Sequence, residues 1–133
     1  MNNAARIYTQ LSLQGVNPVG LVVGLYDNAL KSLYRARRAM EANDIELRTQ
    51  HLNHVLCIVA HLQGSLDLEQ GGEVAQTLLQ FYTYARARVL EVSLTNSKEK
   101  LNDLASQFSS LRGAWHVVET QVPEDLKSTV ARA

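Results

Sequence analysis

Apolar residues recur along the chain in four stretches, at alternating steps of three and four positions. That spacing places them on one face of an α-helix. The first stretch runs from about Pro18 to about Ala42, and Asn17 before Pro18 makes a favourable helix start. Its apolar stripe consists of Val22, Tyr26, Ala29, Leu33, Ala36 and Met40. Charged residues occupy the other faces, so the pattern predicts an amphipathic helix.

The second and third stretches meet at a pair of glycines. The second opens at Asn43, which has the form of a capping box with Glu46, and closes near Gly71 and Gly72. Because glycine supplies the backbone freedom that a turn needs, we predict that the chain reverses there and that a third helix begins at Val74. The two stripes are Leu52, Val55, Val59, Leu62 and Leu66, and then Ala75, Leu78, Tyr82, Ala85, Val89 and Val92.

A fourth stretch follows a second cap-like pair, Asn96 and Glu99, and Pro123 ends it. Its stripe has the most regular heptad spacing in the chain: Leu101, Leu104, Phe108, Leu111, Trp115 and Val118. Four amphipathic helices of about 22 to 26 residues with short polar turns predict an all-α, antiparallel up-down four-helix bundle. We expect one domain over 1–133, with a core at about 17–120, an N-terminal arm at 1–16 and a loose C-terminal tail at 121–133.

The size, charge balance and cysteine content of the chain argue against several classes of function, among them nucleic-acid binding and membrane insertion. A chain of 133 residues with 46% hydrophobic content can bury a core without disulfides or metals. Thirteen basic residues balance thirteen acidic ones, so nucleic acid is not an expected partner, and the arginine clusters at 35–38 and 86–88 are interpreted as solvated helix faces. A single cysteine, Cys57, and no apolar run of about 18 residues favour a reducing, cytoplasmic location without membrane insertion.

The sequence contains few residues in arrangements that could bind a metal ion or catalyse a reaction. His51, His54 and His61 span about 15 Å of one helix, too far for one metal ion. The pair His116 and Glu119 reverses the order of the Glu-x-x-His element of di-iron bundles and occurs once. No phosphate-binding loop is present, and Cys57 has no oxyanion site beside it in the sequence. We therefore expect no catalytic residues, no cofactor and no metal.

Several apolar residues lie off the stripes and exceed what one seam per helix requires: Leu47, Ile58, Leu68, Leu79, Leu90, Leu94 and Val117. Scattered exposure of such residues is ordinary, whereas a contiguous patch would indicate a surface for a partner helix.

Four segments in order also resemble one known family. They are NPVGLVVGLYDNAL, RARRAMEANDIE, SLDLEQGGEVAQTLLQFYTYARARVLEVSLTN and LRGAWHVV, and they lie between about Ile7 and about Val118. Together they are similar to the flagellar secretion chaperone family FliS. The resemblance implies a cytosolic export chaperone that binds the disordered C-terminal segment of flagellin, prevents its premature polymerisation and docks it at the export gate component FlhA.

The resemblance and the off-stripe positions suggest site residues. We expect the flagellin groove to include His54, Ile58, His61, Leu79 and Tyr82, and we expect Tyr8 in the arm to contact the export gate. A monomer or weak homodimer is expected. The alternative is a generic helical adaptor or assembly protein whose heptad seams serve dimerisation or bind partner helices.

Overall fold

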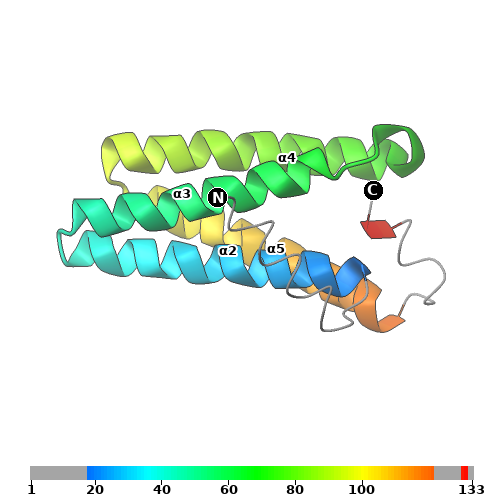
Figure 1. Cartoon of the computed structure of the whole chain (residues 1–133), viewed down its shortest axis with the longest axis horizontal. Helices are drawn as coiled ribbons and strands as arrows, with labels where there is room; N and C mark the ends of the chain where they lie inside the picture. The colour runs from blue at the N-terminus through cyan, green and yellow to red at the C-terminus, as the bar shows by residue number, and fades with distance from the viewer. Residues whose placement is uncertain (1–17, 122–129, 132–133) are drawn as a thin grey trace.

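The computed structural model describes residues 18–121 and 130–131, which form an all-α bundle (Figure 1). Its long helices are α2 (Pro18–Glu41), α3 (Ile45–Gly64), α4 (Leu68–Thr95) and α5 (Lys98–Gln121). The predicted four-helix fold is therefore confirmed for this part of the chain. The expected arm lies outside the described residues.

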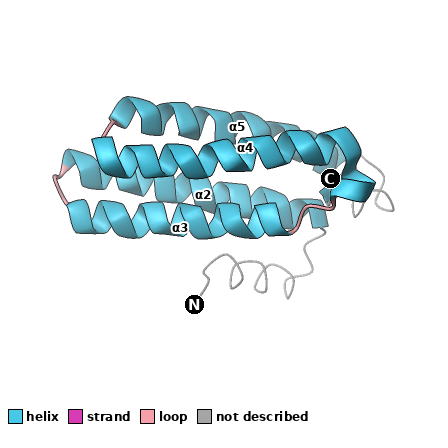
Figure 2. Cartoon of the chain, turned by 90° about the horizontal axis from the view of Figure 1, so that it is seen from above, coloured by secondary structure: helices cyan, strands magenta, loops and turns pink. Residues whose placement is uncertain are grey.

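Consecutive helices run in opposite directions and are joined by short turns (Figure 1). Seen from above, α4 lies over α2, while α3 and α5 lie on opposite sides of that pair (Figure 2). Helix α2 packs against α3 and α5, and α4 packs against the same two helices. Each helix therefore buries the sector that faces its neighbours and leaves an outer sector free.

The core follows the apolar stripes closely. Its largest fully buried side chains include Tyr26, Tyr82 and Phe108, and Trp115 is also buried, as its heptad position predicted. The rings of Tyr26 and Phe108 meet edge to face, with centroids 5.6 Å apart. Beyond α5, Val130 and Ala131 are half-buried and pack against this core, and the remainder of the expected tail lies outside the described residues.

Two predicted N-caps, Asn43 and Asn96, are wrong by one residue, as the turns at one end of the bundle show. Asn43 and Asn96 end α2 and α4 in the left-handed conformation, with φ of 56° and 54°. The residues that follow them cap the next helices. Asp44 accepts a hydrogen bond from the Leu47 amide at 3.0 Å, and Ser97 accepts one from the Lys100 amide at 3.2 Å. Asparagine tolerates this conformation better than most residues, whereas an N-cap residue usually has negative φ, as Asp44 does here with φ −94°.

The predicted reversal at the glycine pair is also wrong in position. Helix α3 ends at Gly64, and Asp67 caps α4 by accepting hydrogen bonds from the amides of Glu69 and Gln70. Gly72 instead produces a kink within α4, with φ 55° and ψ −132°. Gly72 therefore separates a short helical segment after Asp67 from the long remainder of α4, so glycine supplies the expected break in the helix, but the turn itself begins earlier, after Gly64.

No helix within residues 18–121 combines the length and the hydropathy that crossing a bilayer requires.

Candidate partner-binding face

Helix α3 carries very little charge on any of its faces. From Thr49 to Leu66 the sequence contains no aspartate, glutamate, lysine or arginine. An amphipathic helix on a protein surface usually sets charged residues opposite its buried stripe. From Thr49 onward the outer surface of α3 is therefore covered by side chains without a permanent charge, and removing these from water costs less free energy than removing charged ones.

Hydrogen bonds between α3 and α4 show which residues of the two helices face each other. Arg86 donates from Nη1 to Gln63 Oε1 at 3.1 Å, and Arg48 donates from Nη2 to the Ser93 carbonyl at 3.3 Å. Residues seven positions apart share a side of a helix, so Leu56 accompanies Gln63, and Leu79 accompanies Arg86. We define the α3–α4 face as the outer surface along this seam: Thr49, Leu56, Ala60 and Gln63 with Leu79, Thr83, Arg86, Leu90 and Leu94.

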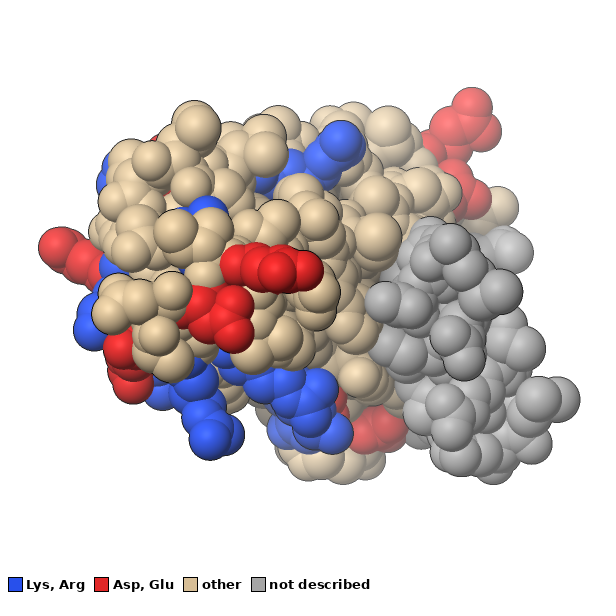
Figure 3. Space-filling view, turned by 60° about the vertical axis from the view of Figure 1, so that its left-hand side comes forward, with Lys and Arg blue, Asp and Glu red and all other residues tan. Residues whose placement is uncertain are grey.

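This face exposes large apolar side chains. Leu90 is 55% exposed and Leu94 is 87% exposed, while Leu56 and Leu79 are half-buried between the helices. Arg86 is the only charged residue of the face, and it is already bonded to Gln63. In Figure 3 most of the upper part of the visible surface is tan, with basic side chains crossing it and acidic side chains at its right-hand edge. A neutral surface bearing exposed leucines is typical of sites where an apolar helix docks.

Of the residues predicted for the groove, only Leu79 lies on the α3–α4 face. Ile58 and Tyr82 are fully buried, so the expectation that Ile58 lies outside the core is wrong. Because α3 packs against both α2 and α4, its buried sector is wider than a single heptad stripe, and Ile58 lies within it, four positions after His54, which contacts Ser32 of α2.

Tyr82 lies in the core, where its hydroxyl forms a buried hydrogen bond, and it is not a surface residue. Its hydroxyl shares a hydrogen bond with the Tyr26 hydroxyl, with the two oxygens 2.8 Å apart. Burial raises the pKa of both phenols, so both stay neutral and the bond satisfies each hydroxyl. This pairing leaves Tyr82 unavailable to a partner in the folded bundle.

The predicted histidines lie on the side of α3 that faces α2. His54 Nδ1 is 3.2 Å from Ser32 Oγ, and its Nε2 is buried without a hydrogen-bond partner among the described residues. Burial, together with the charges of His51 and Arg35, lowers the pKa of His54. His61 is half-buried, and because it lies seven positions after His54 it is on the same side of α3. The predicted set is therefore divided between one side of α3, which holds His54, Ile58 and His61, and α4, which holds Leu79 and Tyr82.

Sequence reasoning missed Leu56 and left Leu90 and Leu94 out of the predicted groove. The sequence signal that could have identified them is the uncharged run in α3 together with the off-stripe leucines of α4. A helix on a protein surface usually carries charged residues on its outer side, so a run without them suggests that this side is covered by a partner. For metal chemistry, no cluster of three or more histidine, cysteine or acidic side chains that could hold an ion occurs in the described part of the chain.

The fold and this face are typical of a class of helical bundles that bind segments of other proteins. A family model described as "Flagellar protein FliS" matches residues 1–122. The chain belongs to the FliS family of flagellar secretion chaperones.

Characterised relatives carry that description. The flagellar secretion chaperone FliS of Campylobacter jejuni is 31% identical over 117 residues, covering 88% of this chain and 91% of the relative. FliS of Salmonella typhimurium is 29% identical over 112 residues, covering 84% and 83%. FliSB of Pseudomonas aeruginosa is 29% identical over 116 residues, covering 84% and 92%. These proteins support a role in flagellum assembly and export.

Proposed function

We propose that this protein is a cytoplasmic export chaperone that binds the C-terminal segment of flagellin on the α3–α4 face. It keeps that segment from polymerising and delivers it to the export gate component FlhA. The observation that carries the proposal is the neutral outer surface with Leu90 and Leu94 exposed, on a chain of the flagellar chaperone family. No catalytic step is needed, because the activity is binding and release.

The physical logic is coupled folding and binding. A disordered amphipathic segment places its apolar side chains on the α3–α4 face as it becomes helical, and this covers the surfaces that it would otherwise use for assembly. Ordering the segment costs several kcal/mol of interaction energy, so the interface must be extensive. A complex of this kind can be released in steps as the export machinery pulls on the chain.

Calorimetric titration with a flagellin peptide tests the proposal. The peptide covers about the last 50 residues of a flagellin from the same source, and we expect one-to-one binding with a strongly negative heat-capacity change. The double variant Leu90→Glu/Leu94→Glu should weaken binding by roughly a hundredfold, because two carboxylates would be buried against apolar groups. Both positions are exposed, so helicity should be unchanged.

Val117→Glu is the matched control. Val117 is 50% exposed on α5, away from the α3–α4 face, and its substitution should leave the affinity unchanged. Equal losses in the control and in the double variant would refute the assignment of the face. If the peptide does not bind but Leu90→Glu/Leu94→Glu dissociates a dimer, the exposed leucines serve self-association, and the adaptor alternative replaces the chaperone.

For the export gate, the proposal assigns Tyr8, which lies outside the described residues. Tyr8→Ala should spare flagellin binding and impair export. An equal loss of both activities would argue against a separate role for the arm.

A further inference from the structure

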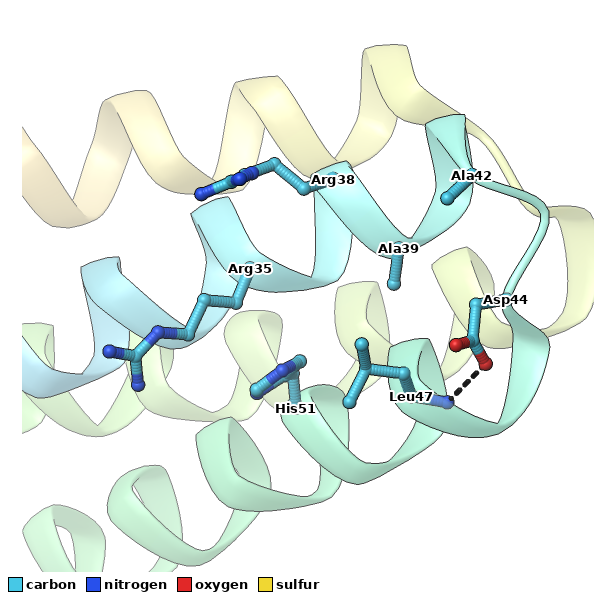
Figure 4. Close-up of a pocket in the computed structure, with 7 residues that line it drawn as sticks. All are labelled: Arg35, Arg38, Ala39, Ala42, Asp44, Leu47 and His51. Carbon is cyan, nitrogen blue, oxygen red and sulfur yellow. Dashed lines mark hydrogen bonds between the residues drawn. The ribbon is translucent and has the colours of Figure 1, made fainter.

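A second candidate site lies on the opposite flank of α3, at the end of the bundle that holds the Asn43 turn. It is a surface pocket of about 330 Å³ between the C-terminal half of α2 and the first turns of α3 (Figure 4). We call it the α2–α3 pocket. It is lined by Arg35, Arg38, Ala39, Ala42, Asp44, Leu47 and His51.

The floor of the pocket is aliphatic. Ala39 and Ala42 of α2 lie across from Leu47 of α3, with Arg35 and His51 towards one end and Asp44 at the other (Figure 4). The Leu47 side chain is 40% exposed. Asp44 is engaged as the α3 cap through the Leu47 amide, so its carboxylate is held at the rim. The small alanines let an incoming side chain approach the α2 backbone closely.

Two arginines of the pocket have no acidic partner among residues 18–121 and 130–131. Arg35 and Arg38 are exposed, and their guanidinium groups make neither an ion pair nor a hydrogen bond with any residue that the structure describes. Other arginines of the bundle are paired. Arg112 contacts Asp27 at 2.9 Å, and Arg88 contacts Glu91 at 3.3 Å.

The two unpaired charges also have a defined spacing. Arg35 and Arg38 are three positions apart, so they project from adjacent turns of α2 on the same side. Two carboxylates one turn apart on another helix would match that spacing. Burial first, and Arg35 second, lower the pKa of His51, so the permanent positive charge at this end comes from the arginines.

We propose that the α2–α3 pocket docks an acidic amphipathic helix of a partner protein. In this complex an aliphatic side chain of the helix lies against Ala39, Ala42 and Leu47, and carboxylates one turn apart pair with Arg35 and Arg38. Helix-in-groove binding of this kind needs an apolar anchor flanked by complementary charge, and the pocket supplies both.

A nucleic acid fits these features less well. The floor consists of aliphatic side chains, the only ring in the lining is the His51 imidazole at one end, and Asp44 at the other end would repel a continuous line of phosphates. The site is also separate from the α3–α4 face, because it uses the α2 flank of α3. A client segment on the α3–α4 face and an acidic helix in the α2–α3 pocket can therefore be bound together, and the proposal does not depend on the flagellin assignment.

Fluorescence anisotropy with synthetic peptides tests the pocket. The probe is a peptide of about 18 residues, long enough to form a helix on binding, with a leucine stripe flanked by glutamates. A second peptide has lysine at every glutamate position. We expect the glutamate peptide to bind and the lysine peptide not to bind. We also expect the affinity to fall between about 50 mM and about 500 mM NaCl, because exposed ion pairs are screened by salt.

Variants of the protein locate the binding. Arg35→Ala/Arg38→Ala should raise the Kd for the glutamate peptide roughly tenfold, as expected for two exposed charge pairs. Leu47→Ala should raise the Kd several-fold. The matched control is Arg37→Ala, because Arg37 lies on the same helix but donates to Asn102 of α5, and its Kd should equal that of the unmodified protein. Circular dichroism and urea midpoints establish that each variant is folded.

Three results would overturn the proposal. One is equal affinity for the glutamate and lysine peptides. Another is loss of probe binding in Leu90→Gln with no loss in the double arginine variant, which would place the probe on the α3–α4 face. The third is displacement of the probe by a single-stranded oligonucleotide whose own binding needs Arg35 and Arg38, which would assign the pocket to nucleic acid.

Discussion

Arg48 of α3 donates from Nη1 to Asn96 Oδ1 at 2.8 Å, and this contact joins the two turns at one end of the bundle. A second bond runs from Nη2 to the Ser93 carbonyl at 3.3 Å. Arg48 is only 7% exposed, although it is charged. Its guanidinium therefore fixes the start of α3 against the end of α4 by hydrogen bonds to neutral groups, with no acidic partner in the described part of the chain.

A comparison of Asn43 with Asn96 distinguishes the effect of the Arg48 hydrogen bond on stability from the effect of the left-handed backbone conformation. Both Asn43 and Asn96 have positive φ, which glycine adopts freely, but only Asn96 bonds to Arg48. We expect Asn96→Gly to lower the free energy of unfolding by about 1 kcal/mol, because a charge-assisted bond is lost. Asn43→Gly should change it by less than about 0.5 kcal/mol. Urea denaturation measures both, and equal effects would show that the Arg48 bond contributes nothing.

Two glycines of the helices should respond to alanine with opposite signs. Gly72 has φ 55° and ψ −132°, which alanine adopts only with strain, so Gly72→Ala should destabilise the protein by about 1 to 3 kcal/mol. Gly113 lies in the exposed interior of α5, with open space where an added methyl group would stand, so Gly113→Ala should stabilise the protein by about 0.5 to 1 kcal/mol.

Thermal unfolding of the two glycine variants provides the measurement. The space around Gly72 is as open as that around Gly113, so steric crowding cannot account for a difference between them. Stabilisation of the protein by Gly72→Ala would mean that the kink in α4 is not a feature of the folded state.

The helices could be predicted from the sequence because each carries a long apolar stripe. A stripe of this length identifies a helix even when the residues at which the helix begins and ends are assigned incorrectly. The ends themselves depended on which residue of Asn43-Asp44 and of Asn96-Ser97 caps the next helix. Both residues of each pair are favourable caps, so only the backbone conformation decides between them. The glycine pair was ambiguous in the same way, since Gly72 permits a kink or a turn equally well.

The Tyr26 and Tyr82 hydroxyls form a buried polar pair between opposite helices, α2 and α4. Removing one hydroxyl leaves the other without this partner in the core, so Tyr82→Phe should cost about 1 to 2 kcal/mol of stability. Tyr26→Phe/Tyr82→Phe should cost less than the sum of the two single variants. A double-mutant cycle of urea unfolding measures a coupling of about 1 kcal/mol. Strict additivity would show that the two hydroxyls do not interact.

The candidate site was harder to predict than the fold. An apolar stripe identifies the residues that a helix buries against one neighbouring helix. Because α3 packs against two helices, Ile58 is buried in the core although it lies off the stripe. His54 likewise faces Ser32 rather than a surface groove. Leu79 reaches the α3–α4 face because α4 exposes most of the sector beyond its stripe. Which side of a helix is free depends on the order of helices around the bundle, and periodicity carries no information on that order.

His51 and His54 make stability depend on pH in a defined window. Burial is the main cause that lowers the pKa of each ring; Arg35 adds to it for both, and His51 adds to it for His54. Below the ordinary histidine pKa of about 6.5 the unfolded chain therefore binds more protons than the folded protein. The free energy of unfolding contributed by these rings is fully present above about pH 6.5, and it is lost as the pH falls through the lowered pKa values.

Urea midpoints measured from about pH 8 to about pH 5 test this expectation. We expect His54→Gln to reduce the loss of stability on acidification, because the imidazole, whose buried Nε2 has no partner among the described residues, no longer has to accept a proton. His116→Gln is the control, since His116 is exposed and lies 3.5 Å from Glu119. The pKa of Glu91, lowered mainly by its bond to Lys100, adds a loss only in the lower range where glutamates titrate, so it does not obscure the histidine window. An identical pH profile for His54→Gln and the unmodified protein would show that protonation of His54 does not oppose folding.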